Sequence, residues 1–160
     1  MSDTNLLDAI RVVKENERIA SQTYANAAKK LINPLARQLF EQLSAFEQFH
    51  YDKVSQLEKS LIEKGNYISY EGKDFPLPPV FEIKAAQEAD RKSAISIVTD
   101  AIDLERQAEK TYADLADRVA DPEGHAMFRR LSEEEHNHYK ILSEAYWTLT
   151  NLGVWKWSHP

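Results

Sequence analysis

The chain has 160 residues and a net charge of −6, with 42% apolar residues, 4 Gly and no Cys. This length predicts one domain, over residues 1–160, that buries a sizeable core, while the few glycines are too rare for the turns of an ordinary β-sandwich, barrel or Gly-rich nucleotide fold. The lack of Cys excludes disulfides, thiolate metal sites and thiol nucleophiles within these residues, and the acidic balance argues against nucleic acid as a partner.

Two long helices joined by a short turn are predicted at the start of the chain. Apolar residues recur at helical spacing from about 4 to 32 and again from about 34 to 64. Between these segments, Asn33-Pro34 is typical of a helix N-cap followed by proline in the first turn. Gly65-Asn66 is a typical helix end. These segments therefore predict a helical hairpin.

The segment from about 65 to 92 loses the helical periodicity and predicts a long crossover. It includes YISYEGKDFPLPPVFEIK, which contains three prolines, and a short helix is compatible with EIKAAQEAD at 82–90. A helix of about 27 residues is about 40 Å long, and an extended connection of similar residue count spans that length easily. The crossover can therefore carry the chain back along a helical bundle.

A second helical hairpin is predicted after the crossover, with helices from about 93 to 120 and from about 122 to 152. Asp121-Pro122 repeats the cap signal of the first hairpin. In the short tail we expect Trp155 and Trp157 to pack back on the bundle. Two helical hairpins joined by one long crossover define an all-α, ferritin-like four-helix bundle.

The two hairpins are related by an internal repeat with a shift of 88 residues. Between positions 17 and 55, 15 of 39 residues are identical to their counterparts without a gap. Two unrelated amphipathic hairpins would share apolar residues, but here polar residues match as well. The matched polar pairs are Glu17 with Glu105, Tyr24 with Tyr112, Glu47 with Glu135, and His50 with His138.

Helical spacing places the matched acids on the apolar faces of their helices. Glu17 and Glu105 each lie three or four residues from apolar neighbours, and Glu47 and Glu135 share a face with apolar residues and with a His three positions later. All four helices therefore direct a carboxylate toward the core, and two of them add an imidazole one turn on.

Four carboxylates in one core require compensation. A single uncompensated buried carboxylate costs several kcal/mol, and four would exceed the stability of a typical domain. No Lys or Arg lies on these faces, whereas two divalent cations would balance four negative charges and bind the neutral imidazoles. The sequence therefore predicts a dinuclear metal site of the type found in ferritin-like bundles. Its predicted ligands are Glu17, Glu47, His50, Glu105, Glu135 and His138.

Other polar residues near the predicted ligands are not themselves predicted to bind metal. Tyr24 and Tyr112 lie two turns beyond the first glutamate of each hairpin, where they either pack in the bundle or donate hydrogen bonds to ligand carboxylates, two compatible roles. Glu133 and Glu134 are interpreted as solvated acids beside a ligand, and His136 as a solvent-facing residue.

The chain resembles the rubrerythrin family of ferritin-like diiron proteins over all four predicted helices, roughly residues 4 to 152. The resemblance rests on Glu17, Glu47-x-x-His50, Glu105 and Glu135-x-x-His138, and on the Tyr seven residues after the first glutamate. It implies a non-haem diiron centre in which Glu47 and Glu135 bridge the two irons. It further implies that each His completes one iron and that Glu17 and Glu105 are terminal ligands.

The resemblance implies that this centre reduces hydrogen peroxide to water, in defence against oxidative stress, and that the protein is a homodimer. Rubrerythrins proper carry a rubredoxin domain with iron on four Cys, and these residues contain none, so the implied electron donor is a separate protein such as a rubredoxin. Family members usually have a further ligand Glu where this chain has Ala108, and Glu109 is the neighbouring candidate for that place.

Other functions remain open at this stage. They are a ferroxidase that handles iron with dioxygen or peroxide, an oxidase of an organic substrate, and a metal-free structural bundle. The same ligands accept Mn, or Zn as an adventitious metal, in place of iron. We expect a cytoplasmic protein without a membrane partner, because neither a secretory leader nor an apolar run of about 20 residues is present.

Overall fold

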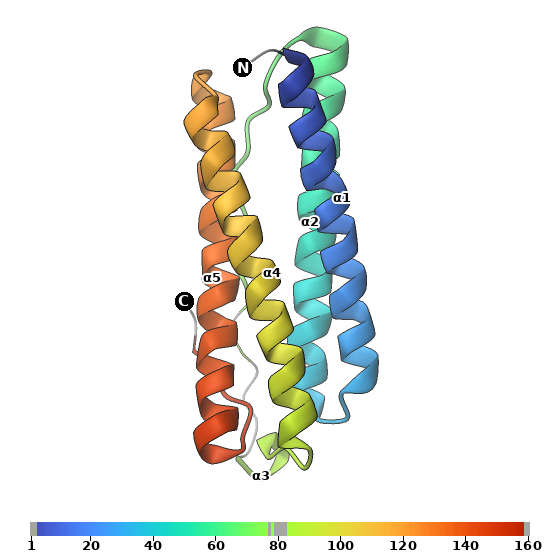
Figure 1. The fold of residues 1–160 in the computed structure, drawn as a ribbon, viewed down its shortest axis with the longest axis vertical. Coiled ribbons are helices and arrows are strands. Elements are labelled where there is room, and N and C mark those ends of the chain that lie inside the picture. Colours follow the sequence, from blue (N-terminus) through green and yellow to red (C-terminus); the bar gives the residue numbers. More distant parts are fainter. Residues whose placement is uncertain (1–2, 77, 79–82, 159–160) are drawn as a thin grey trace.

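The computed structural model describes residues 3–76, 78 and 83–158, which form a bundle of four long helices (Figure 1). These helices begin and end within two residues of the predicted positions, and the short helix expected at 82–90 is a single turn within that range. The all-α, ferritin-like prediction is confirmed. In chain order the helices are α1 (Asp3–Lys30), α2 (Pro34–Lys64), α3 (Ile83–Ala86), α4 (Arg91–Arg118) and α5 (Pro122–Leu152).

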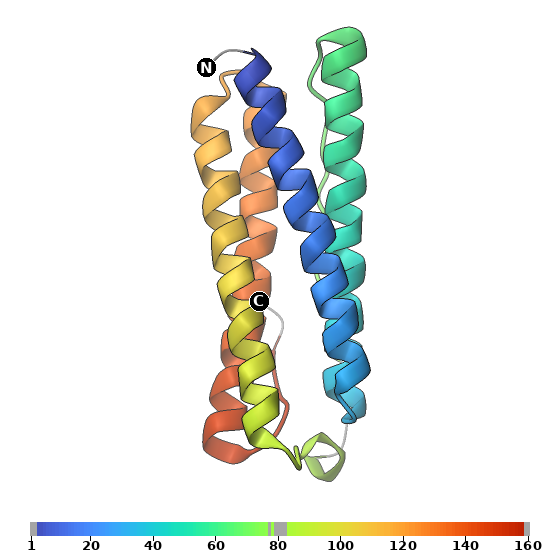
Figure 2. The same cartoon turned by 45° about the vertical axis from the view of Figure 1, so that its right-hand side comes forward.

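The turns of the two hairpins are built in the same way. The side chains of Asn33 and Asp121 each accept hydrogen bonds from two backbone N–H groups in the first turn of the next helix, which begins with proline. α2 and α5 end at Gly65 and Gly153, which adopt left-handed φ angles of 71° and 69°. The α1–α2 and α4–α5 hairpins then pack side by side, with α1 next to α4 (Figure 2).

The buried apolar residues form two clusters, one toward each end of the bundle. One cluster surrounds Phe40 and Trp155, and the other surrounds Leu57 and Phe128. Along each long helix, the residues of one cluster are separated from those of the other by buried Glu, or by buried Glu and His. The core is therefore interrupted at mid-length by a polar layer.

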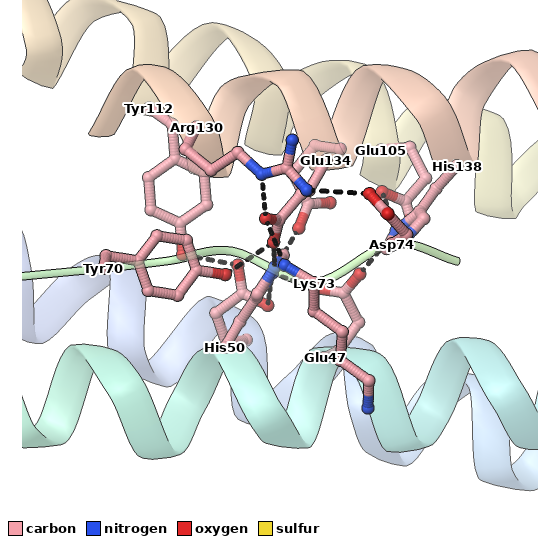
Figure 3. Close-up of polar contacts among 12 residues, drawn as sticks. Glu47, His50, Tyr70, Lys73, Asp74, Glu105, Tyr112, Arg130, Glu134 and His138 are labelled. Atoms are coloured by element: carbon pink, nitrogen blue, oxygen red, sulfur yellow. Dashed lines mark hydrogen bonds and ion pairs between the residues drawn. The ribbon is translucent and has the colours of Figure 1, made fainter. Parts of the chain in front are cut away.

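The crossover runs along the bundle between α2 and α5 (Figure 3), and of its described residues before position 77 only Phe75 is fully buried. On the α2 side, the buried ring of Phe75 stacks on Phe46 with ring centroids 5.9 Å apart. On the α5 side, the Tyr70 hydroxyl and the Lys73 backbone N–H donate hydrogen bonds of 2.6 and 2.9 Å to Glu134. The crossover thus acts as a fifth packed element, of which residues 77 and 79–82 lie outside the described residues.

The tail after α5 folds back on the bundle, as predicted. Trp155 and Trp157 are buried, and Trp155 Nε1 donates a 3.0 Å hydrogen bond to Glu88. The backbone N–H of Trp155 also donates a hydrogen bond to the carbonyl oxygen of Ala86, at the end of α3. Within the described part of the chain, no helix combines the length and apolar character needed to cross a membrane.

The fold predicts that Gly72→Ala destabilises the protein more than Gly65→Ala. Both glycines have positive φ, 83° and 71°, so each substitution carries backbone strain of about 1 kcal/mol. A Cβ at Gly72 would also collide with Arg130 and Glu134, whereas no atom lies within 4 Å of one at Gly65. We expect Gly72→Ala to lower the free energy of unfolding by a further 1–3 kcal/mol or so, measured by urea denaturation. Equal losses would contradict tight packing of the crossover on α5.

Candidate metal centre

Six ionisable side chains from the four long helices meet in the polar layer. All six are buried, with exposed fractions of 3% or less. Every residue that the sequence predicts as a metal ligand is therefore brought to this layer. They are Glu17 of α1, Glu47 and His50 of α2, Glu105 of α4, and Glu135 and His138 of α5.

The six side chains form two overlapping groups. One group is Glu17, Glu47, His50 and Glu135, and the other replaces Glu17 and His50 by Glu105 and His138. Within each group, one oxygen or ring nitrogen from every residue lies within 4.8 Å of the others. Glu47 and Glu135 belong to both groups, so the layer offers two adjacent ligand sets that share two carboxylates.

Several donor atoms of this cluster have no hydrogen-bond partner. They are Oε2 of Glu17, Oε2 of Glu105, Oε1 of Glu135 and Nδ1 of His50. The last two lie 2.7 Å apart, but their geometry is not that of a hydrogen bond. Because buried polar atoms are costly when unsatisfied, these converging atoms fit a cation that would bind them together. Carboxylates combined with imidazoles are ligands that suit iron, manganese and zinc.

Two tyrosines each hold a carboxylate of the opposite hairpin, that of Glu105 or of Glu17. The Tyr24 hydroxyl on α1 donates a 2.8 Å hydrogen bond to Oε1 of Glu105 on α4. The Tyr112 hydroxyl on α4 donates a 2.7 Å hydrogen bond to Oε1 of Glu17 on α1. In both carboxylates the second oxygen, Oε2, is left without a partner. Each tyrosine therefore orients a carboxylate and leaves one oxygen available to a ligand.

Without a metal, protons balance the charges of the cluster. Burial, together with the neighbouring carboxylates, raises the pKa of Glu17 and of Glu135 well above the ordinary value. Burial also acts to raise the pKa of Glu47, but hydrogen bonds from Glu17 and the two imidazoles outweigh it and lower this pKa. Burial acts to lower the pKa of His138, but the charges of Glu105 and Glu47 raise it to about 9. Metal binding would therefore displace protons from the layer.

The interpretation of Glu134 as a solvated acid is wrong. Glu133 is exposed as expected, but Glu134 is buried, and its Oε1 lies 2.8 Å from Nε2 of His50. The cause is the crossover, which covers this face of α5. The internal repeat contained a signal for this burial, because the counterpart of Glu134 is the core residue Phe46.

Glu109 does not take the place of a ligand at position 108. Its carboxylate lies 2.7 Å from Nδ1 of His136, and both side chains are partly exposed. His136 is therefore on the surface, as predicted. Ala108 instead lines a cavity of about 140 Å³ that reaches the carboxylates from the α1–α4 side. Apolar side chains on its wall include Val13, Ile19, Ala20 and Leu104.

Comparisons with known proteins agree with this fold. The model of the rubrerythrin family matches residues 1–58 and 78–150. Among solved structures, a hypothetical protein from Pyrococcus furiosus is similar, with a TM-score of 0.75 and 20% identity, over 97% of this chain and 96% of that chain. At this identity the likeness shows the fold alone. No curated protein matches the sequence.

The protonated cluster predicts that the metal-free protein loses stability as pH rises. His138 has a pKa raised from 6.5 to about 9, so the stabilisation by its proton is complete below pH 6.5 and lost by about pH 9. The raised pKa values of Glu17 and Glu135 act in the same direction. After chelator treatment, we expect the free energy of unfolding to fall by about 3 kcal/mol over this range.

Urea denaturation at a series of pH values measures this loss. His138→Gln should remove the part of the loss that His138 contributes and leave the parts of Glu17 and Glu135, while His136→Gln, on the surface, should leave the loss unchanged. A free energy of unfolding that rises between pH 6.5 and about pH 9 would contradict the charge balance described above.

Proposed function

Because the chain belongs to the rubrerythrin family, we propose that its two overlapping ligand sets hold two iron ions and that the loaded protein reduces hydrogen peroxide to water. The observation that carries this proposal is the convergence of buried carboxylates and imidazoles whose donor atoms lack hydrogen-bond partners. Two iron ions, each changing between Fe(II) and Fe(III), would supply the two electrons needed to cleave the O–O bond. Two protons and two electrons convert one peroxide into two water molecules.

The shared residues support a division of roles among the ligands. We propose that Glu47 and Glu135 bridge the two metals, because each belongs to both ligand sets. Glu17 and Glu105 would each serve one metal through Oε2, since a tyrosine occupies the other oxygen of each. Each imidazole would complete one ligand set.

The cavity that leads to the carboxylates favours a small, neutral oxidant. The cavity of about 140 Å³ between α1 and α4 leads to the carboxylates through mainly apolar walls. A charged oxyanion would lose its hydration there and would meet acidic side chains, whereas peroxide and dioxygen carry no charge. The two tyrosine hydroxyls hold their carboxylates at the inner end of this path.

Peroxide reduction also requires a source of electrons outside the described cluster. The 160 residues contain no Cys, so they cannot form the four-Cys iron site of a rubredoxin. We propose that an electron donor of the rubredoxin type, outside these 160 residues, restores Fe(II) after each turnover.

The proposal predicts that peroxide oxidises the Fe(II)-loaded protein much faster than dioxygen does. Stopped-flow mixing of the anaerobic protein with either oxidant follows the near-ultraviolet absorption of the diferric centre. We expect oxidation of the Fe(II)-loaded protein by peroxide to be about two orders of magnitude faster than oxidation by dioxygen, or more. Equal rates, with oxidation continuing beyond two irons per chain, would instead identify a ferroxidase.

A second prediction concerns Glu47, which belongs to both ligand sets. Glu47→Ala should abolish binding of both metals, because it removes a ligand from each set. Glu41→Ala, an exposed residue of the same helix, should retain two metals per chain. Metal analysis after anaerobic loading and desalting measures both. If the unmodified protein retained no metal, the structural-bundle alternative would be favoured.

A further inference from the structure

The internal repeat differs at the position that directly precedes each shared carboxylate. A shift of 88 residues aligns Phe46 of α2 with Glu134 of α5, and each residue directly precedes a shared carboxylate ligand. Both side chains are buried, and each contacts the imidazole of the opposite hairpin. Glu134 contacts His50. Phe46 packs against His138 at a centroid distance of 4.4 Å and also against His50 of its own helix, at 5.1 Å. The two imidazoles therefore have chemically different neighbours at equivalent places.

Four hydrogen bonds hold the carboxylate of Glu134 (Figure 3). Oε1 accepts from the Tyr70 hydroxyl at 2.6 Å and contacts Nε2 of His50 at 2.8 Å. Oε2 accepts from the Lys73 backbone N–H at 2.9 Å and from Nε of Arg130 at 2.7 Å. Each oxygen thus has two partners, which favours the ionised form and leaves Glu134 without a free oxygen for a metal.

This arrangement fixes the orientation and the tautomer of His50. An ionised carboxylate only accepts hydrogen bonds, so Nε2 of His50 must be the donor. In the neutral ring, Nδ1 then carries the lone pair, and it lies 2.7 Å from Glu135 and 3.7 Å from Glu17. A carboxylate bonded to the far nitrogen of a ligand imidazole also strengthens the ring as a donor to metal.

His138 lacks an equivalent partner. Its Nε2 is buried without a hydrogen bond, and its ring is bordered by the aromatic rings of Phe46 and Phe75, at centroid distances of 4.4 and 5.2 Å. These apolar rings restrict the position of the imidazole, but they offer no acceptor that would select one tautomer.

We propose that Glu134 is a positioning residue that makes the two metal positions unequal. The position that contains His50 binds its metal more tightly and fills first, and the position that contains His138 fills second. This inference rests on the proposed function in one respect only, that the two ligand sets bind metal at all.

The test is an anaerobic titration of the metal-free full chain with Co(II), followed by visible absorption and calorimetry. We expect two separate binding steps in the unmodified protein. Glu134→Gln keeps the shape of the side chain and should weaken the tight step about 10- to 100-fold while leaving the weak step in place. Glu133→Gln, the matched change at the exposed neighbour, should reproduce the unmodified titration.

A second pair of variants assigns the steps without relying on Glu134→Gln. His138→Ala should retain the tight step and lose the weak one, and His50→Ala should do the reverse. In the Co(II)-loaded protein, proton NMR should also show a shifted imidazole N–H that exchanges slowly with solvent, and His50→Ala should remove it.

Two outcomes would overturn the inference while leaving the metal centre intact. One is a pair of equal binding steps in the unmodified protein, and the other is a tight step that persists in both His50→Ala and Glu134→Gln. Failure of the unmodified protein to bind Co(II) would overturn the proposed function itself, and the inference with it.

Discussion

The structure depends on one constraint, the burial of four carboxylates and two imidazoles in a single layer of a helical bundle. The layer interrupts the apolar core, so the packing that stabilises the fold divides into two clusters on either side of it. The helices cannot separate at the layer without exposing both clusters. Tyr24 and Tyr112 tie the two hairpins together across it, since each donates to a carboxylate of the other hairpin.

The two sides of this layer are closed in different ways. On the α2–α5 side, the crossover fills the space between the helices and contributes Tyr70, Lys73 and Phe75 to the surroundings of the imidazoles. On the α1–α4 side, Ala20 and Ala108 occupy equivalent positions of the repeat, and their small side chains leave the cavity open. The cavity therefore reaches the carboxylates from the face opposite the crossover.

The sequence was sufficient to predict the helices and the burial of six ionisable side chains in one layer, because both follow from local signals. The bounds of the helices follow from caps such as Asn33-Pro34, and the buried layer follows from acids repeated on apolar faces. Glu134 was misjudged because its burial comes from the crossover, a segment without periodicity whose path depends on distant contacts. The sequence also left open whether Glu109 replaces a ligand at position 108. The structure decides this point, because the Glu109 carboxylate lies 2.7 Å from Nδ1 of His136 on α5.

The direction of the crossover has a consequence for symmetry. A twofold axis that exchanges the two hairpins would run between α2 and α5, and it would reverse any chain that lies along the bundle there. A single segment runs in one direction only, so it cannot be symmetric about this axis. It therefore contacts the two imidazoles differently, one through Tyr70 and Glu134 and the other through Phe75. A chain that joins two copies of one hairpin by a single connection along the bundle is therefore obliged to differentiate its two halves.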